Sequence, residues 1–200
     1  MTGVVIRVKI GKIFKIFFAA CVILVIGFVG VRYYMIRDNS VLTELYPTDA
    51  AKAEFRRGED GFLTHDFSDE ISKDGYFSAF GFVYLSGEHE IQLTGKYNDS
   101  LLSTYFKDDS EEDFTWELRD ENGKTLSYGE IVSREEKYQY NFFRIVFDGV
   151  EIGKDSELYL ALVNKVENYP ADGAKVFCVH TPNQELERYE LTENEKISMK

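Results

Sequence analysis

Cysteine is scarce in this sequence, and its scarcity excludes a disulfide framework. The chain has two cysteines, Cys21 and Cys178, and Cys21 falls within an apolar run. Cys178 therefore has no intradomain partner in the rest of the chain. Because the surrounding letters VFCVH are typical of a strand, we expect a buried and unreactive thiol, with a disulfide between two chains as the alternative.

Recognised catalytic motifs are lacking as well. The sequence has no Gly-x-Ser-x-Gly elbow, no glycine-rich phosphate loop before a helix, no paired-cysteine zinc pattern and no His-Glu-x-x-His. Its only histidines, His65, His89 and His180, show no metal-ligand spacing, although their convergence in space with carboxylates stays open as a metal-site or hydrolase alternative. We predict no catalytic residue, no cofactor-binding residue, no metal site and no enzyme activity.

Positive charge is sparse after the N-terminal region. All 35 acidic residues but only 17 of the 23 basic ones lie from Asp38 onward, so this part carries a formal net charge of −18. Such a charge argues against nucleic acid as a partner and against docking on anionic lipid. It favours a basic partner or a bound cation, and the alternative is a solvated acidic surface that keeps the domain soluble.

The densest run of acids, Asp108–Asp113, holds five carboxylates in six residues. A calcium ion takes six to eight oxygen ligands in irregular geometry, so a loop of this composition is a candidate calcium site. The run lacks the alternating ligand spacing and the central glycine of an EF-hand loop. A solvated loop between two strands and a docking loop for a basic partner are the alternatives.

Long apolar runs are limited to one, which spans residues 13–36 and has charges only near its ends, at Lys15 and Arg32. At about 1.5 Å per helical residue it would reach about 36 Å, enough to cross a hydrocarbon core of about 30 Å. Long side chains near the interface can place their charges among the headgroups. We therefore predict a single transmembrane helix over 13–36, with a buried core helix as the alternative.

The orientation of this helix is predicted from its flanking charges. Four basic residues and no acid precede the uncharged part of the run, whereas two basic residues follow it before the sequence becomes acidic: Arg7, Lys9, Lys12 and Lys15 before, Arg32 and Arg37 after. The positive-inside rule then places residues 1–12 in the cytoplasm and the C-terminal domain outside it, in the periplasm or at the cell surface. A cleaved signal peptide and a lipoprotein lipidated at Cys21 are alternatives that would export the same domain.

A connector, residues 37–61, follows the apolar run and has partly helical character. Thr48 is placed to cap a helix with the sequence DAAKAEFRR, which has an acid early and two arginines late. Gly58 is placed to end it. The connector could form a stalk or pack on the domain, and the pattern does not distinguish the two.

From residue 62 to residue 183 the sequence alternates with a period of two, in short segments rich in aromatic and β-branched residues. The predicted strands are FLTHDF, YFSAFGFVYL, EIQLTGKY, LLSTYF, DFTWELR, KTLSYGEIV, YQYNFFRIVF, ELYLALVNK and AKVFCVHT. Asn122-Gly123 predicts a tight hairpin, because both residues tolerate a positive φ. About nine short strands of this kind predict an all-β fold, an immunoglobulin-like or jelly-roll antiparallel β-sandwich, followed by a polar C-terminal tail at 184–200.

Two features of the strand segments bear on surface and function. In EIQLTGKY, Gln92, Thr94 and Lys96 alternate with apolar residues, which predicts a half-buried strand with one polar face. Aromatic residues occupy successive positions in YQYNFF, so rings lie on both faces of that strand. Exposed rings would suit a protein or carbohydrate contact, and coverage by loops or by the connector is the alternative.

We therefore predict a single-pass, membrane-anchored extracytoplasmic domain that acts as a protein-binding or assembly module in the cell envelope. The expected partners are the lipid bilayer, through residues 13–36, and a protein for which basic charge would be favourable. The alternatives are a domain that binds carbohydrate or an envelope polymer, and an anchored immunity protein against a basic secreted toxin.

Overall fold

The computed structural model describes residues 10–36, 42, 44–67, 77–98, 114–137, 140–164, 175–182 and 184–200. The chain divides into two compact units, Met1–Arg37 and Asp38–Lys200. The predicted strand LLSTYF and the candidate calcium run Asp108–Asp113 lie outside the described residues.

The first unit contains the helix α1 (Ile10–Ile36), which begins three residues before the predicted span. Within it, the 21 residues Phe14–Tyr34 are long and apolar enough to cross a membrane, and none of this window is buried inside the protein. The predicted N-terminal apolar helix is therefore confirmed. Apart from Lys15 and Arg32 near its ends, this window carries apolar side chains on every face.

The second unit is an antiparallel β domain with short helices. The helices are α2 (Asp49–Arg57), the 3-10 turn η2 (Glu59–Gly61) and α4 (Glu193–Ser198), and the strands are β1 (Phe62–Thr64), β2 (Phe77–Leu85), β3 (Glu90–Asn98), β4 (Phe114–Arg119), β5 (Thr125–Lys137), β6 (Tyr140–Phe147), β7 (Leu158–Asn164), β8 (Lys175–His180) and β9 (Glu187–Arg188). Strands β1 to β8 correspond to eight of the nine predicted segments, and β5 continues past its predicted segment to Lys137. The segment predicted as a polar tail, 184–200, contains β9 and α4.

All nine strands join one sheet in the order β8-β7-β4-β5-β6-β3-β2-β1-β9, and the pairs that define it are antiparallel. The all-β antiparallel class is confirmed. The immunoglobulin-like or jelly-roll sandwich is not confirmed, because the strands form one curled sheet of half-barrel type and not two separate sheets.

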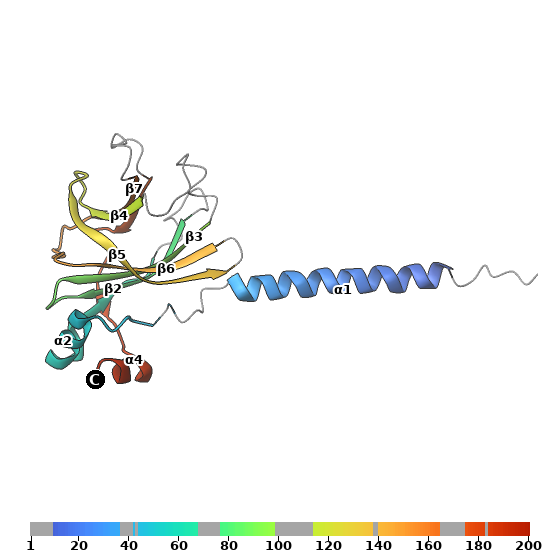
Figure 1. Cartoon of the computed structure of the whole chain (residues 1–200), viewed down its shortest axis with the longest axis horizontal. Coiled ribbons are helices and arrows are strands. Elements are labelled where there is room, and N and C mark those ends of the chain that lie inside the picture. Colours follow the sequence, from blue (N-terminus) through green and yellow to red (C-terminus); the bar gives the residue numbers. More distant parts are fainter. Residues whose placement is uncertain are drawn as a thin grey trace, which may run out of the picture. The chain divides into compact units, whose positions relative to one another are not determined.

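The curl of the sheet is produced by β5, whose two halves have different neighbours. Residues 125–129 pair with β4, whereas residues 130–137 pair with β6, and a β-bulge lies between Ile131 and Ser133. A bulge bends its strand and increases the local twist, so β5 carries the sheet around a corner. Figure 1 shows β5 running from the side of β4 and β7 to the side of β2, β3 and β6.

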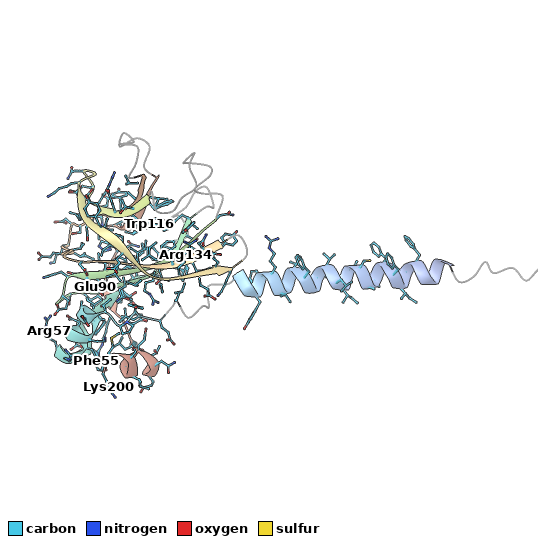
Figure 2. The ribbon with its side chains drawn as sticks, viewed as in Figure 1. Phe55, Arg57, Glu90, Trp116, Arg134 and Lys200 are labelled. Carbon is cyan, nitrogen blue, oxygen red and sulfur yellow. The ribbon has the colours of Figure 1, made fainter. Side chains whose placement is uncertain are left out.

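The main core fills the concave side of this curl. Phe77 of β2 stacks on Phe177 of β8 with ring centroids 4.2 Å apart, although these strands lie near opposite ends of the sheet order. Trp116 of β4, labelled in Figure 2, stacks on Phe143 of β6 at 5.1 Å. Aromatic contacts of this kind hold the two arms of the sheet together from within.

A second apolar cluster covers the outer side of β1 and β2. It combines residues from the connector, α2, the sheet and the C-terminal segment: Leu45, Ala51, Phe62, Val83, Leu85, Leu191 and Met199. Figure 1 shows α2 and α4 on the same side of β2. The connector therefore packs on the domain. In this region the sheet is covered on both faces, by the main core on one side and by the second cluster on the other.

This double coverage overturns the prediction of a half-buried β3. Gln92 and Thr94, expected on a polar solvent face, are buried, and Lys96 alone of the three is partly exposed. On β6, Phe142 and Phe143 point to opposite faces and both are fully buried. Alternation of polar and apolar residues predicts a strand with one buried face and one solvent-exposed face. In β3 the polar face is covered as well, by residues that are distant in sequence.

Two local predictions are confirmed by hydrogen bonds. Helix α2 has the predicted bounds, with Thr48 as N-cap accepting from the Ala51 N–H at 2.9 Å and with the N–H of Gly58 closing its C-terminus on the Glu54 carbonyl. The β4–β5 hairpin forms at Asn122-Gly123, but only Gly123 has a positive φ, 77°. The Asp120 side chain stabilises this turn by accepting from the N–H groups of Asn122 and Lys124.

Candidate binding groove

A groove of about 760 Å³ lies on the outer side of the sheet, between the start of α2 and strands β5 and β6. Its lining comes from four separate parts of the chain: Tyr46, Pro47, Thr48, Asp49 and Ala50; Glu88 and Glu90; Glu130, Ile131 and Val132; Val146 and Asp148. The volume falls in the range of small-molecule and peptide sites. Because the connector forms one wall, the groove exists only while the connector is held on the sheet.

Buried polar side chains of β3 hold the connector in this position. The Tyr46 N–H donates to Gln92 Oε1 and Gln92 Nε2 donates to the Tyr46 carbonyl, both at 2.9 Å. Thr48 Oγ1 donates to Glu90 Oε1 at 2.8 Å, and Gln92 Nε2 also donates to this oxygen at 2.8 Å. The polar residues of β3 therefore fix the position of the connector through hydrogen bonds. Figure 2 shows Glu90 beside α2.

Arg144 fixes the connector at a second point. This buried residue of β6 donates from its guanidinium group to the Leu42 carbonyl. Burial lowers its pKa to about 10, while nearby Tyr189, Glu195 and Glu44 favour the charged form. It lines a smaller cavity of about 150 Å³ on the same side of the sheet.

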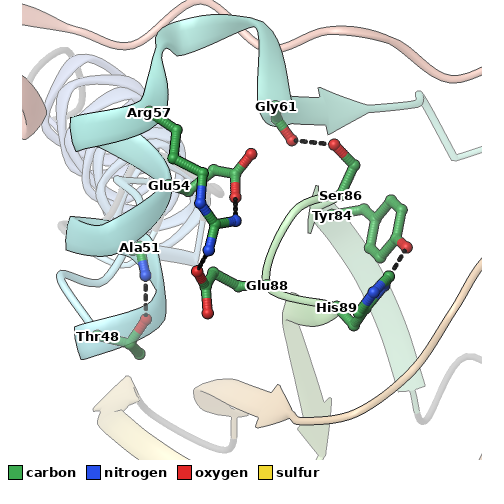
Figure 3. Close-up of polar contacts among 9 residues, drawn as sticks. All are labelled: Thr48, Ala51, Glu54, Arg57, Gly61, Tyr84, Ser86, Glu88 and His89. Atoms are coloured by element: carbon green, nitrogen blue, oxygen red, sulfur yellow. Dashed lines mark hydrogen bonds and ion pairs between the residues drawn. The ribbon is translucent and has the colours of Figure 1, made fainter.

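Five carboxylates line the groove, and two of them have cationic partners. Glu88 pairs with Arg57, which also contacts Glu54 of its own helix at 3.3 Å, as Figure 3 shows. Asp49 lies 3.9 Å from Lys52 in an exposed pair of little expected energy. Within the described part of the chain, the other three make no ion pair: Glu90, Glu130 and Asp148.

Apolar surface lies beside these charges. Ile131, Val132 and Val146 line the groove, and Ile131 is 43% exposed. Further along β5, Tyr128 is 68% exposed and Leu126 is also exposed. An apolar strip beside unpaired carboxylates can bind a chain that carries both aliphatic and cationic groups.

The carboxyl group of Glu90 has a raised pKa. Its side chain is buried, and burial raises its pKa, whereas hydrogen bonds from Gln92 and Thr48 lower it. The neighbouring Asp148 raises the Glu90 pKa further, both through its charge and through a carboxyl–carboxylate hydrogen bond. Burial and the neighbouring carboxyl group therefore both disfavour the negative charge of Glu90, and a cation at this place would favour it.

The structure brings two of the three histidines together. The rings of His65, just after β1, and His180, at the end of β8, have centroids 5.3 Å apart, and both stack on Phe82. His89 lies apart in the β2–β3 turn, with φ 56° and its Nδ1 3.3 Å from the Tyr84 hydroxyl. No cluster of three or more His, Cys, Asp or Glu side chains suited to a metal ion occurs in the described ranges.

The lone thiol of the domain lies in a strand, as predicted. Cys178 belongs to β8 and is partly buried, and burial raises its pKa. Its Sγ lies 3.6 Å from the His180 carbonyl, to which it donates. A thiol with a raised pKa is a poor nucleophile at neutral pH.

The groove residues were not predicted from the sequence. Glu90, Glu130 and Asp148 are scattered among 35 acidic residues, and no spacing distinguishes them. The one available signal was the run Glu90-Ile91-Gln92, whose polar members share one face of a strand. Only the coverage of that face by the connector makes it part of a site.

Comparisons of the chain with protein-family models, with curated proteins and with solved structures give no match. The function of the groove therefore has to be inferred from its own geometry and charge.

Proposed function

We propose that the chain is a single-pass membrane protein whose C-terminal domain lies outside the cytoplasm and binds a protein partner through the groove. The observation that carries this proposal is the combination of an apolar strip with five carboxylates in a groove of about 760 Å³. Charge of this sign steers and selects a basic partner, while the apolar strip supplies contact area. The proposal assigns no catalytic step.

The membrane part of the proposal rests on α1 and its flanks. The helix has the length and apolarity of a membrane span, and basic residues are more numerous before it than after it. The domain that follows carries a net charge of −18, which keeps it soluble beside the lipid surface. A basic secreted toxin is one partner of this class, for which the domain would act as an anchored immunity protein.

A protein partner is favoured over a carbohydrate by the placement of the aromatic residues. Stacking on sugars requires accessible rings, but Phe142 and Phe143, candidates for this role, are fully buried. Tyr128 is strongly exposed, but it lies on β5 beside apolar residues and carboxylates. These neighbours suit a polypeptide better than a polyol.

The proposal is tested by site-specific photocrosslinking in the native host. A photoreactive amino acid replaces Ile131, in the groove, in the full membrane-anchored chain, and Lys124 in the β4–β5 hairpin serves as the control position. We expect one dominant protein adduct from position 131 and none from position 124. The adduct should disappear when Glu130 and Asp148 are both replaced by lysine.

Equal labelling from both positions, or no adduct at position 131, would contradict the binding proposal.

The orientation is tested separately by adding protease to intact cells or spheroplasts. Digestion of the C-terminal domain from outside supports it, and protection that ends only when the membrane is opened contradicts it.

A further inference from the structure

Side-chain donors hold one of the two oxygens of the Glu90 carboxyl group. Its side chain is 2% exposed, and both of its hydrogen-bond donors, Thr48 Oγ1 and Gln92 Nε2, engage Oε1. The carboxyl group of Asp148 lies against that of Glu90 through the carboxyl–carboxylate hydrogen bond described above. Glu90 also lines the groove, so a donor that enters from outside can replace this contact at Oε2.

The strand register places a second carboxylate beside it. Ile91 of β3 pairs with Phe147 of β6, so Glu90 and Asp148 occupy the next positions of the same antiparallel ladder and share one face. Side chains directly opposite each other in such a ladder have Cβ atoms about 5 Å apart. The Ser127 hydroxyl donates to the Asp148 carbonyl at 2.8 Å and fixes its backbone.

No cation of the described chain neutralises this pair. Arg57 is engaged by Glu54 and Glu88, and Lys52 lies beside Asp49. Like charges at opposite positions of a ladder are destabilising, so a cation from outside would relieve a repulsion that the fold itself leaves in place.

The geometry of the acceptors selects among cations. A guanidinium fork binds best to both oxygens of one carboxylate, but Glu90 Oε1 already accepts two hydrogen bonds. An ammonium group is a point charge with three independent donors, and two separate carboxylates can share it. Val146 and Ile131 line the same groove and would contact the four methylene groups of a lysine side chain.

We propose that Glu90 and Asp148 form a subsite for a lysine side chain of the partner, with the ammonium group donating to Glu90 Oε2 and to the Asp148 carboxylate. This inference rests on the proposed function and specifies the chemistry of its partner. It predicts that the bound segment presents a lysine flanked by aliphatic residues.

The test uses the full chain in detergent micelles and three capped pentapeptides, Ala-Val-Xaa-Val-Ala, in which Xaa is Lys, Arg or Gln. We expect the lysine peptide to bind about tenfold more tightly than the glutamine peptide, as for a charge-assisted contact, and more tightly than the arginine peptide. Glu90→Gln, which keeps the acceptor at Oε1, and Asp148→Asn should each remove this preference. Glu121→Gln in the exposed β4–β5 hairpin makes the same change in charge and should leave it intact.

Equal binding of the lysine and glutamine peptides, or an equal loss in Glu121→Gln, would overturn the proposal, because the attraction would then come from bulk charge. If Glu90→Gln fails to fold, the variant Asp148→Asn at an exposed position tests whether the lysine preference depends on the pair. A crosslinked partner at position 131 without any lysine preference would leave the groove as a docking site and remove only the subsite. A lysine preference without a crosslinked partner would support the lysine subsite and contradict the proposal that the groove binds a protein partner.

Discussion

At the scale of single residues, the two histidines His65 and His180 have an unusual environment. Both rings are buried, and two ring nitrogens, His65 Nε2 and His180 Nδ1, have no hydrogen-bond partner. Burial lowers the pKa of both histidines, to about 4 for His180, where the neighbouring His65 lowers it further. For His65, the backbone of Asp66 and Val179 and the charge of Asp66 oppose the effect of burial. Charged groups also line the cavities beside the two rings: Lys154 and Glu185 with His180, and Glu44, Asp66 and Arg144 with His65.

This environment predicts a loss of stability in acid. Because the pKa of His180 is lower in the folded protein than the ordinary 6.5, its contribution is complete above about pH 6.5 and is lost as the pH falls toward 4. The loss is at most about 3 kcal/mol for this group. Urea unfolding of the wild type and of His180→Phe at a series of pH values checks it. The variant should lose less stability over this interval, and parallel curves would contradict the prediction.

Gly129 illustrates a second constraint at this scale. A Cβ at this position would lie 2.4 Å from Ile145 Cγ2 and 2.8 Å from the ring of Phe147, both in the main core. We expect Gly129→Ala to destabilise the domain by about 1–3 kcal/mol, as overpacking does. Gly153→Ala is the matched control, because its Cβ would approach only Ser156 Oγ, at 3.6 Å. Equal urea midpoints for the two variants would contradict this expectation.

At the scale of elements, the C-terminal helix α4 depends on one buried carboxylate. Glu195 is 1% exposed and accepts from the Thr192 N–H at 2.6 Å and the Tyr189 hydroxyl at 2.7 Å. It also accepts from the N–H of Leu45 in the connector, so it joins the two ends of the domain. The sequence contains the capping box Thr192 to Glu195, but it does not reveal that the same carboxylate binds the connector.

Replacing this carboxylate should therefore loosen both segments. We expect Glu195→Ala to cost about 2–4 kcal/mol, because it removes a cap and leaves buried donors unpaired. Amide hydrogen exchange should accelerate at Leu45 and in α4, whereas the exposed Glu193→Ala on the same helix should change little. Unchanged exchange at Leu45 would show that the connector is held by other contacts.

The strands themselves could be predicted, because alternation and turn residues are local. Thr48, Gly58 and Gly123 mark the ends of elements in the sequence, and the structure confirms each of them. The bulge of β5 could not be predicted, since no residue between Ile131 and Ser133 demands it. Without the bulge the same segments are compatible with a sandwich, which is why the all-β antiparallel class is confirmed and the sandwich is not.

At the scale of the whole molecule, α1 and the β domain are separate compact units. Because the described side chains of both apolar clusters come from residue 45 onward, we expect a chain that begins at Asp38 to fold and remain soluble. Its far-ultraviolet circular dichroism and its urea midpoint should match those of the domain in the full chain. Aggregation of this shortened chain, or a lower midpoint, would show that α1 supports the domain.

The hydrogen bonds between the connector and the sheet also affect how the domain responds to force. Tension on the preceding chain would reach the sheet first at Leu42, which Arg144 of β6 holds, and then at Tyr46, which is bonded to Gln92 of β3. Strand β3 is flanked on both sides, by β2 and β6, so a pull arriving there is shared between two ladders. Force applied to an edge strand would break the hydrogen bonds of the sheet one at a time. Force applied through this connector acts on a strand inside the sheet.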